Sequence, residues 1–139
     1  MDKHIEELFV RAFFDKTFAD RLYYELTAES KRGRFFDKIA HNADRYLKHS
    51  TVIRRSIAPL PVSDISKHLM CSKGQCYVIA YRHEFDGCFV DIDDTIQKLH
   101  SCGSPYVMFN AEKCTAYIET EYDFSVHESY LLQADNGER

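Results

Sequence analysis

The spacing of apolar residues divides the chain into a helical first part and a strand-rich remainder. Between residues 2 and 27, apolar side chains recur every three or four positions, which is the period of one helical face. Polar residues around Asp15 interrupt this stripe, so one helix or two both fit the pattern. A second stripe over residues 30–47 predicts another helix, with Phe35 and Phe36 on its apolar face. This helix begins either near Ser30 or, if the basic residues there form a solvated loop, near Phe35.

Short apolar runs separated by turn residues follow from residue 51 onward, as is typical of strands. The run over residues 51–57 predicts an edge strand, because prolines follow it closely. Cys76–Tyr81 is almost continuously apolar, as expected for a strand covered on both faces. Residues 114–120 alternate apolar with polar side chains, which predicts a strand with one solvent-exposed face.

These patterns predict an α+β fold: a helical N-terminal third packed on a small mixed or mostly antiparallel sheet of four to six strands, with one or two further short helices. A length of 139 residues suits a single domain over residues 1–139. We expect it to divide into a helical part (1–48), a sheet part (51–132) and a tail (133–139).

Composition and chain start indicate a cytoplasmic protein with no membrane segment. No run reaches the roughly 18 apolar residues that a membrane-spanning helix needs, and the N-terminus lacks the basic-then-apolar order of a signal peptide. The five cysteines are an odd number in a chain large enough to fold without disulfides. We expect them to be reduced thiols.

Charge is distributed unevenly along the chain. Residues 1–75 carry 14 Lys and Arg against 10 Asp and Glu, whereas residues 76–139 carry 4 against 12. Such a division can produce one basic and one acidic surface.

The acidic part contains the sharpest local motif, Asp91-Ile92-Asp93-Asp94-Thr95 after an apolar run. It resembles the first motif of the haloacid-dehalogenase phosphotransferases, in which the first aspartate is the nucleophile and the second the acid/base. That family needs further catalytic elements on later strands, and only about 45 residues remain here. We therefore expect these aspartates to cap a helix and to present negative charge.

No other pattern predicts catalysis or a bound cofactor. His68, Cys71, Cys76 and His83 could supply zinc ligands, but they lack the paired Cys-x-x-Cys spacing of structural zinc sites. None of the glycines forms a phosphate-binding loop. We expect no enzymatic activity, no cofactor and no metal site.

Two surfaces remain as candidates for binding. Acids interleaved with aromatic residues are typical of protein interfaces, where aromatic side chains anchor a partner and acids attract a basic one. The predicted protein-binding residues are Asp86, Asp91, Asp93, Asp94, Tyr117, Glu119, Glu121, Tyr122 and Asp123. A basic segment over residues 31–55 offers an alternative, nucleic-acid-binding surface made of Lys31, Arg32, Arg34, Arg45, Arg54 and Arg55.

In size, acidity and lack of a catalytic motif, the chain resembles immunity proteins of bacterial toxin systems, including those of contact-dependent growth inhibition. The resemblance implies a non-catalytic binding protein that neutralises a toxin, possible targets including a basic nuclease domain. The alternative hypothesis is a nucleic-acid-binding or phage-derived regulatory protein that uses the basic segment.

Overall fold

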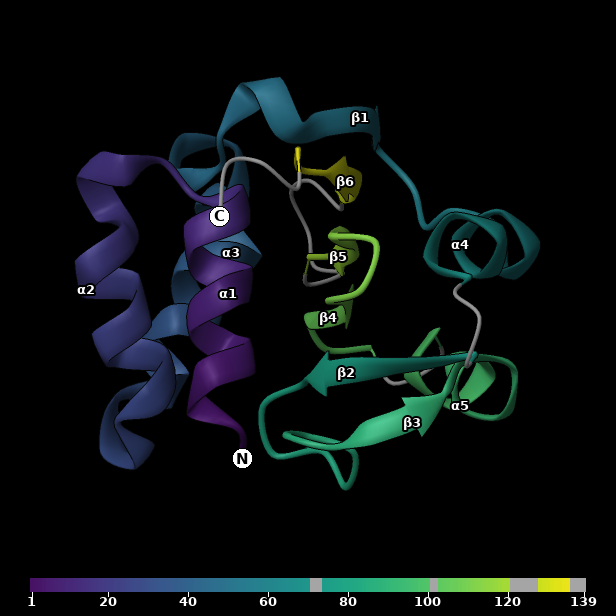
Figure 1. Cartoon of the computed structure of the whole chain (residues 1–139), viewed down its shortest axis with the longest axis horizontal. Helices are drawn as coiled ribbons and strands as arrows, with labels where there is room; N and C mark the ends of the chain where they lie inside the picture. Colours follow the sequence, from purple (N-terminus) through teal and green to yellow (C-terminus); the bar gives the residue numbers. More distant parts are fainter. Residues whose placement is uncertain (71–73, 101–102, 121–127, 136–139) are drawn as a thin grey trace.

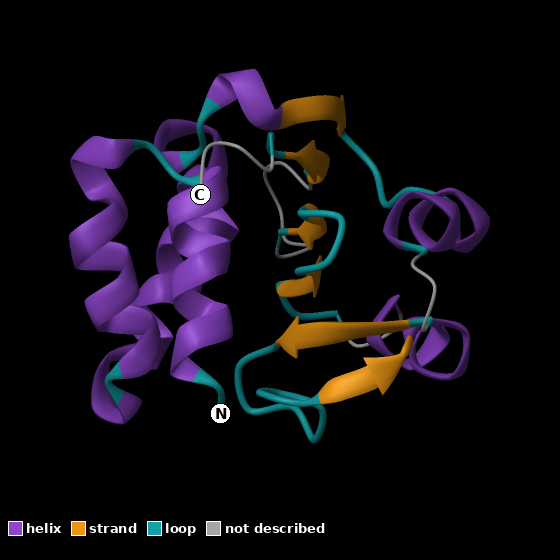
Figure 2. Ribbon diagram, in the orientation of Figure 1, coloured by secondary structure: helices purple, strands orange, loops and turns teal. Residues whose placement is uncertain are grey.

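The chain folds into three layers, with one sheet between two groups of helices (Figure 1). The computed structural model describes residues 1–70, 74–100, 103–120 and 128–135. Three N-terminal helices cover one face of the sheet, and two later helices lie on the other (Figure 2). The predicted α+β fold, with N-terminal helices that precede the sheet, is confirmed.

The N-terminal layer consists of α1 (Lys3–Phe13), α2 (Lys16–Thr27), the 3-10 turn η1 (Glu29–Lys31) and α3 (Arg32–Tyr46). The remaining elements are η2 (His49–Thr51), β1 (Val52–Ser56), α4 (Val62–Leu69), β2 (Gln75–Ile79), β3 (Phe89–Asp91), α5 (Ile92–His100), β4 (Tyr106–Asn110), β5 (Thr115–Glu119) and β6 (Ser129–Gln133).

The region of residues 2–27 therefore contains two helices. The break comes at Phe14, whose extended backbone forms a bridge with Leu47 after α3. Asp15 then starts α2, because its side chain accepts a hydrogen bond from the Thr17 N–H at 2.9 Å. An aspartate at this position satisfies one of the backbone donors that a helix start leaves unpaired.

All neighbouring strands of the sheet are antiparallel, in the order β1-β6-β5-β4-β2-β3. The strand predicted at residues 51–57 lies at one edge, as expected, and pairs with β6 although about 75 residues separate them in the chain. The short β3 forms the other edge. Strand β2 is buried at four of its five positions, as the apolar run at Cys76–Tyr81 predicted.

An aromatic core joins the N-terminal layer to the sheet. Phe9 and Phe13 of α1 contact Phe109 of β4, with ring centroids 5.5 and 5.8 Å apart, respectively. Phe35 and Phe36 of α3 are buried in the same core, as their helical spacing predicted. Aromatic pairs at such separations stabilise a core beyond the area that they bury.

The prediction of one solvent-exposed face for residues 114–120 is wrong. All five residues of β5 are buried, because α4 and α5 cover the face that the polar residues occupy. Ile118 packs under the N-terminal helices. Tyr117 points to the other face of the sheet, into a second hydrophobic core that includes Ile65 of α4 and Leu99 of α5. Polar residues at alternate positions of β5 are therefore buried polar groups and not surface groups.

Among the described helices, none combines the length and the apolar character needed to cross a membrane. Cys76, Cys88 and Cys114, the cysteines that the structure describes, form no disulfide.

Candidate functional site

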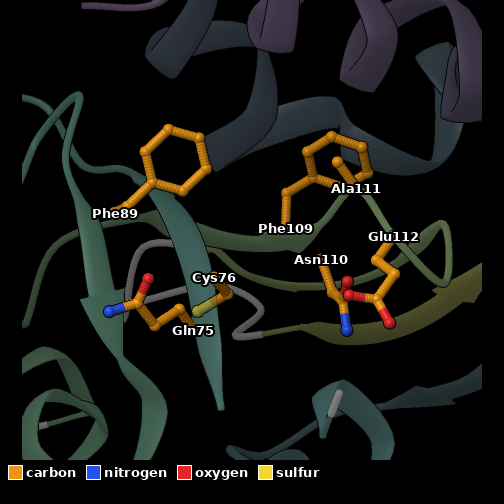
Figure 3. A pocket seen from close by; sticks show the side chains of 7 residues that line it. All are labelled: Gln75, Cys76, Phe89, Phe109, Asn110, Ala111 and Glu112. Carbon is orange, nitrogen blue, oxygen red and sulfur yellow. The ribbon is translucent and has the colours of Figure 1, made fainter. Parts of the chain in front are cut away.

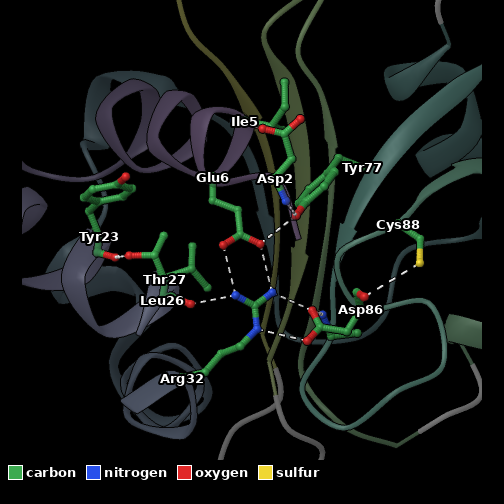
Figure 4. A network of polar contacts seen from close by, with 11 residues as sticks. Asp2, Ile5, Glu6, Tyr23, Leu26, Thr27, Arg32, Tyr77, Asp86 and Cys88 are labelled. Atoms are coloured by element: carbon green, nitrogen blue, oxygen red, sulfur yellow. Dashed lines mark hydrogen bonds and ion pairs between the residues drawn. The ribbon is translucent and has the colours of Figure 1, made fainter. Parts of the chain in front are cut away.

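Asp86, predicted to contact a partner, instead holds Arg32 inside the protein (Figure 4). Arg32 Nε donates to Asp86 Oδ2 at 2.9 Å, and Nη2 donates to Oδ1 at 2.6 Å. The same guanidinium donates to both carboxylate oxygens of Glu6 at 3.0 Å and to the Leu26 carbonyl at 2.6 Å. Arg32 thus joins α1, the end of α2 and the turn after β2.

This buried network has its polar groups well matched. The Tyr77 hydroxyl donates to Glu6 Oε2 at 2.7 Å, and Asp86 Oδ1 also accepts from the Ala80 N–H at 3.0 Å. Burial alone lowers the pKa of Arg32, but its hydrogen bonds to Asp86 and Glu6 outweigh burial and raise that pKa above the ordinary value. Burial has the opposite effect on Tyr77 and raises the pKa of its hydroxyl, because the charged form of a tyrosine is the deprotonated one. The guanidinium and its two carboxylates therefore form a stable internal ion cluster.

Two predicted site residues are corrected by this network. Arg32 has only 3 % of its side chain exposed, and Asp86 has 10 %, so neither presents its charge to a partner. The prediction was wrong because charge counts along the sequence do not show which opposite charges meet in the fold. Arg32 is therefore not part of an exposed basic surface, and Asp86 is not part of an acidic surface.

Glu119 and Tyr117 are also buried. The Tyr117 hydroxyl donates to Glu119 Oε1 at 2.6 Å, and His100 Nε2 lies 3.8 Å from the same oxygen. Burial raises the pKa of Glu119, although the Tyr117 hydroxyl and His100 oppose the rise. Burial also raises the pKa of Tyr117. The predicted role of these two residues in an exposed acidic surface is wrong, because α4 and α5 cover their face of the sheet.

Asp91, Asp93 and Asp94 remain exposed, as predicted. Asp91 caps α5 by accepting a hydrogen bond from the Asp94 N–H at 3.2 Å, and Asp93 accepts one from the Ser66 hydroxyl at 2.9 Å. Within the described residues, the ion pairs include none of these three carboxylates. They add three negative charges to one end of a helix, where the helix dipole stabilises them.

The expected capping role accounts for the position of the aspartate motif. Besides the cap by Asp91, the Thr95 hydroxyl donates to the Asp91 carbonyl at 2.6 Å, so the threonine is engaged by the helix itself. The strand before the motif is an antiparallel edge strand. Glu121, Tyr122 and Asp123, also predicted to contact a partner, lie outside the described residues.

The basic segment is divided between several parts of the structure. Arg54 pairs with Asp64 at 3.1 Å, and Arg55 pairs with Glu128 and Asp44. Arg45 lies over the rings of Phe18 and Tyr46, 5.8 and 5.7 Å from their centroids. Lys31 is half-buried and Arg34 is exposed on the other side of the buried Arg32. The six bases named in the nucleic-acid hypothesis therefore do not form one uncompensated surface.

A cavity of about 210 Å³ opens beside β3, where β2 begins and β4 ends (Figure 3). The rings of Phe89 and Phe109 lie on one side of it, and polar ends of other side chains lie on the other side (Figure 3). Its described lining consists of Gln75, Cys76, Phe89, Phe109, Asn110, Ala111 and Glu112.

Strand register explains why Gln75, Phe89 and Phe109 converge. Tyr77 of β2 lies opposite Phe89 on one side and Phe109 on the other, and Gln75 lies opposite Asp91. Because alternate residues of a strand point to one face, these five residues of β2, β3 and β4 all belong to the face that carries α1. The helices bury Tyr77 and Phe109 but leave Phe89 53 % exposed.

Asp91, Asp93 and Asp94, together with Phe89 and Glu112, form a surface that we call the acidic edge. It combines an exposed aromatic ring, a small cavity and four carboxylates on exposed residues. Such a combination can bind a cationic group, but it supplies no nucleophile paired with a base among the residues named. Among the described residues, no three His, Cys, Asp or Glu side chains are placed to share a metal ion.

Sequence reasoning missed Glu6 and Phe89. Glu6 lies three and four residues before the buried Phe9 and Val10, so its helical phase places it on the apolar face of α1. Arg32 stands in the same relation to Phe35 and Phe36 in α3. A charged residue in the buried phase of each helix was a usable signal for the network. No comparable signal distinguishes Phe89 from the buried Val90 next to it.

A scan against protein-family models, a search of curated proteins and a search of solved structures each found no match to this chain. Function must therefore be inferred from the acidic edge itself.

Proposed function

We propose that this chain is a non-catalytic binding protein that captures a basic protein partner through the acidic edge. The observation that carries the proposal is the exposure of Phe89 on the same face of β3 as Asp91. Phe89 is an aromatic ring that is 53 % exposed on an edge strand beside the aspartates of the acidic edge, and aromatic residues are the side chains that most often anchor a protein interface. Asp91, Asp93 and Asp94 form no ion pair with a described residue, so their charge is available to a partner.

The two kinds of group act at different steps of association. Aromatic side chains at the centre of an interface provide much of its affinity when a partner covers them. Charges at the rim accelerate the encounter and favour partners of opposite sign. The acidic edge places Phe89 beside the cavity and the aspartates at the start of α5, so both effects act on the same partner.

A toxin-neutralising role fits this arrangement best. An immunity protein needs to cover a toxin and performs no reaction, and a nuclease toxin carries a basic surface for its own substrate. We therefore propose a bacterial immunity protein of the cytoplasm whose partner is a basic toxin domain. The proposal retains Asp91, Asp93 and Asp94 from the predicted site and adds Phe89 and Glu112.

Stopped-flow association with a toxin domain encoded beside this chain tests the proposal. The triple variant Asp91→Asn, Asp93→Asn and Asp94→Asn should associate about tenfold more slowly at low salt, and the difference should shrink as salt rises. Asparagine retains the helix cap, so the fold is kept. A control variant with Asp20→Asn, Glu29→Gln and Asp37→Asn removes three exposed charges from the helical layer and should associate at nearly the parent rate.

Equal rates for the two triple variants would contradict the use of the acidic edge. Failure to bind the neighbouring toxin, together with retention of nucleic acid during purification, would favour the alternative function of the basic segment instead. In that case, affinity for nucleic acid should fall steeply as salt rises.

A further inference from the structure

The backbone of β3 pairs with β2 on one side only. The Cys88 carbonyl accepts a hydrogen bond from β2 at 2.9 Å, and the Ile92 N–H donates to the residue before β2 at 3.0 Å. Val90, midway between them, lies opposite β2 as well. Because every second residue of an antiparallel strand bonds to a given neighbour, Phe89 and Asp91 direct their backbone groups away from β2.

Three of these outward groups are open to an added strand. The Asp91 carbonyl accepts from the Thr95 hydroxyl at 2.6 Å, so α5 already uses it. In the part of the chain that the structure describes, no hydrogen bond engages the Phe89 N–H, the Phe89 carbonyl or the Asp91 N–H. Figure 1 shows β3 as the outermost strand, with α5 at its end. The edge thus offers two donors and one acceptor.

The side chains of the same two residues indicate what kind of strand fits. Phe89 and Asp91 lie on one face of β3, and both are exposed. An aromatic or β-branched residue is a favourable cross-strand neighbour for Phe89, and a basic residue is one for Asp91. Asp93 and Asp94 add negative charge beyond the strand end. A second copy of β3 would place like charges opposite one another, so the edge favours a basic partner over itself.

The other edge of the sheet does not fit the same partner. Strand β1 carries Arg54 and Arg55, and its register with β6 shifts between Val52 and Arg54. Such an irregularity twists an edge strand and disturbs the ladder that an added strand would follow. A basic extended segment therefore fits β3 and not β1.

We infer that the partner adds an extended basic segment to β3 as an antiparallel strand, an inference that rests on the proposed function. The main chain of the segment bonds to Phe89 and Asp91, and its alternate side chains provide selectivity. The residue opposite Phe89 is aromatic or β-branched. The residue two positions before it lies opposite Asp91 and is lysine or arginine.

The probe is the capped peptide acetyl-Ser-Lys-Thr-Val-Thr-Lys-amide, in which a lysine precedes the valine by two positions. Amide hydrogen exchange of the full chain, followed by NMR, measures its binding. At saturating peptide, exchange of the Phe89 and Asp91 amides should slow about tenfold, because both become hydrogen-bond donors. The Val90 amide, which faces β2, should be unchanged.

Two methylated forms of the peptide are matched controls. A methyl group on the valine nitrogen removes the donor to the Phe89 carbonyl and should weaken binding at least about tenfold. A methyl group on the nitrogen of the threonine before it lies on the side away from β3 and should leave affinity nearly unchanged. Equal affinity of the two forms, or no slowing of exchange at Phe89 and Asp91, would overturn the inference.

Two variants separate the backbone from the aromatic ring. Phe89→Ala and Phe89→Pro both remove the ring, but only proline removes the outward N–H. Proline is tolerated where the N–H of an edge strand faces solvent, and unchanged exchange at Val90 verifies that β3 stays paired. The proline variant should bind the peptide about tenfold more weakly than the alanine variant. Equal binding by the two variants would contradict strand addition.

Strand addition and the proposed function fail separately. If the peptide protects Phe89 and Asp91 but no neighbouring toxin is captured, strand addition stands and the proposed function fails. If a toxin is captured through the acidic edge but leaves these two amides unprotected in the complex, the proposed function stands and strand addition fails.

Discussion

Arg32 and Glu6, 26 residues apart in the chain, form a bidentate ion pair. Nη1 and Nη2 of Arg32 each lie 3.0 Å from one carboxylate oxygen of Glu6. Asp86 completes the cluster from the turn after β2. This cluster connects the helical layer to the turn that leads into β3. It thus supports the strand that carries the acidic edge.

Replacing Arg32 with methionine should lower the free energy of unfolding by about 3–5 kcal/mol, because it leaves Glu6 and Asp86 as buried carboxylates without a counter-charge. Urea denaturation measures the change. Arg34→Met, two residues later and exposed, should alter stability by no more than about 0.5 kcal/mol. Adding Glu6→Gln and Asp86→Asn to the Arg32→Met variant should restore part of the loss. Equal stability of the two methionine variants would refute the structural role of the cluster.

Glu119 should make the protein less stable as pH rises. Burial raises its folded-state pKa above the ordinary value of 4.5, so the folded state binds more protons than the unfolded state between these two values. Stability from this group is therefore complete below about pH 4.5 and declines as pH rises through the folded pKa.

The variant Glu119→Gln isolates this effect, since glutamine does not titrate. Its free energy of unfolding relative to the parent protein should increase as pH rises above 4.5. Denaturant titrations at a series of pH values measure the difference. A constant difference across that pH range, or one that decreases, would contradict the assignment.

Asn110 should be important for stability although it lines the cavity. Alanine at this position leaves the buried Leu69 carbonyl and the Lys113 N–H without their side-chain partner, which should cost about 1–3 kcal/mol. Thermal and urea unfolding measure the loss. Glu112→Gln, on the same turn but exposed, should change stability by less than about 0.5 kcal/mol. Equal losses would show that Asn110 does not anchor the end of α4.

Asp91 has two separable roles, one in the cap of α5 and one in surface charge. Asp91→Asn should keep stability close to that of the parent protein, whereas Asp91→Ala should lose about 1 kcal/mol, because only asparagine replaces the capping acceptor. Both variants should slow capture of a basic partner to a similar extent. A binding defect confined to the alanine variant would show that the aspartate acts through the helix cap alone.

Several elements of the fold could be predicted because their cause is local. The helical stripes, the apolar run at Cys76–Tyr81 and the capping position of Asp91 follow from spacing and from the needs of a helix start. The edge position of β1 followed from the prolines behind it. These predictions depend only on residues that are close to one another in the sequence.

The candidate site was predictable only in part. Asp91, Asp93 and Asp94 lie at a helix start, where capping and exposure coincide, and their placement was correct. Glu119 and Asp86 were misplaced, because their exposure depends on α4, α5 and Arg32, which lie far from them in the sequence. The cavity between Phe89 and Glu112 had no signal in the sequence at all.

The sequence by itself thus determined which segments are helices and strands and where the negative charge is concentrated, since both depend on neighbours in the chain. Only the tertiary structure decided which charges are neutralised inside and which remain at the surface. The reason is physical: an ion pair such as that of Arg32 with Glu6 forms between distant residues when packing brings them together. The carboxylates of the acidic edge are among those that remain exposed after such pairs have formed.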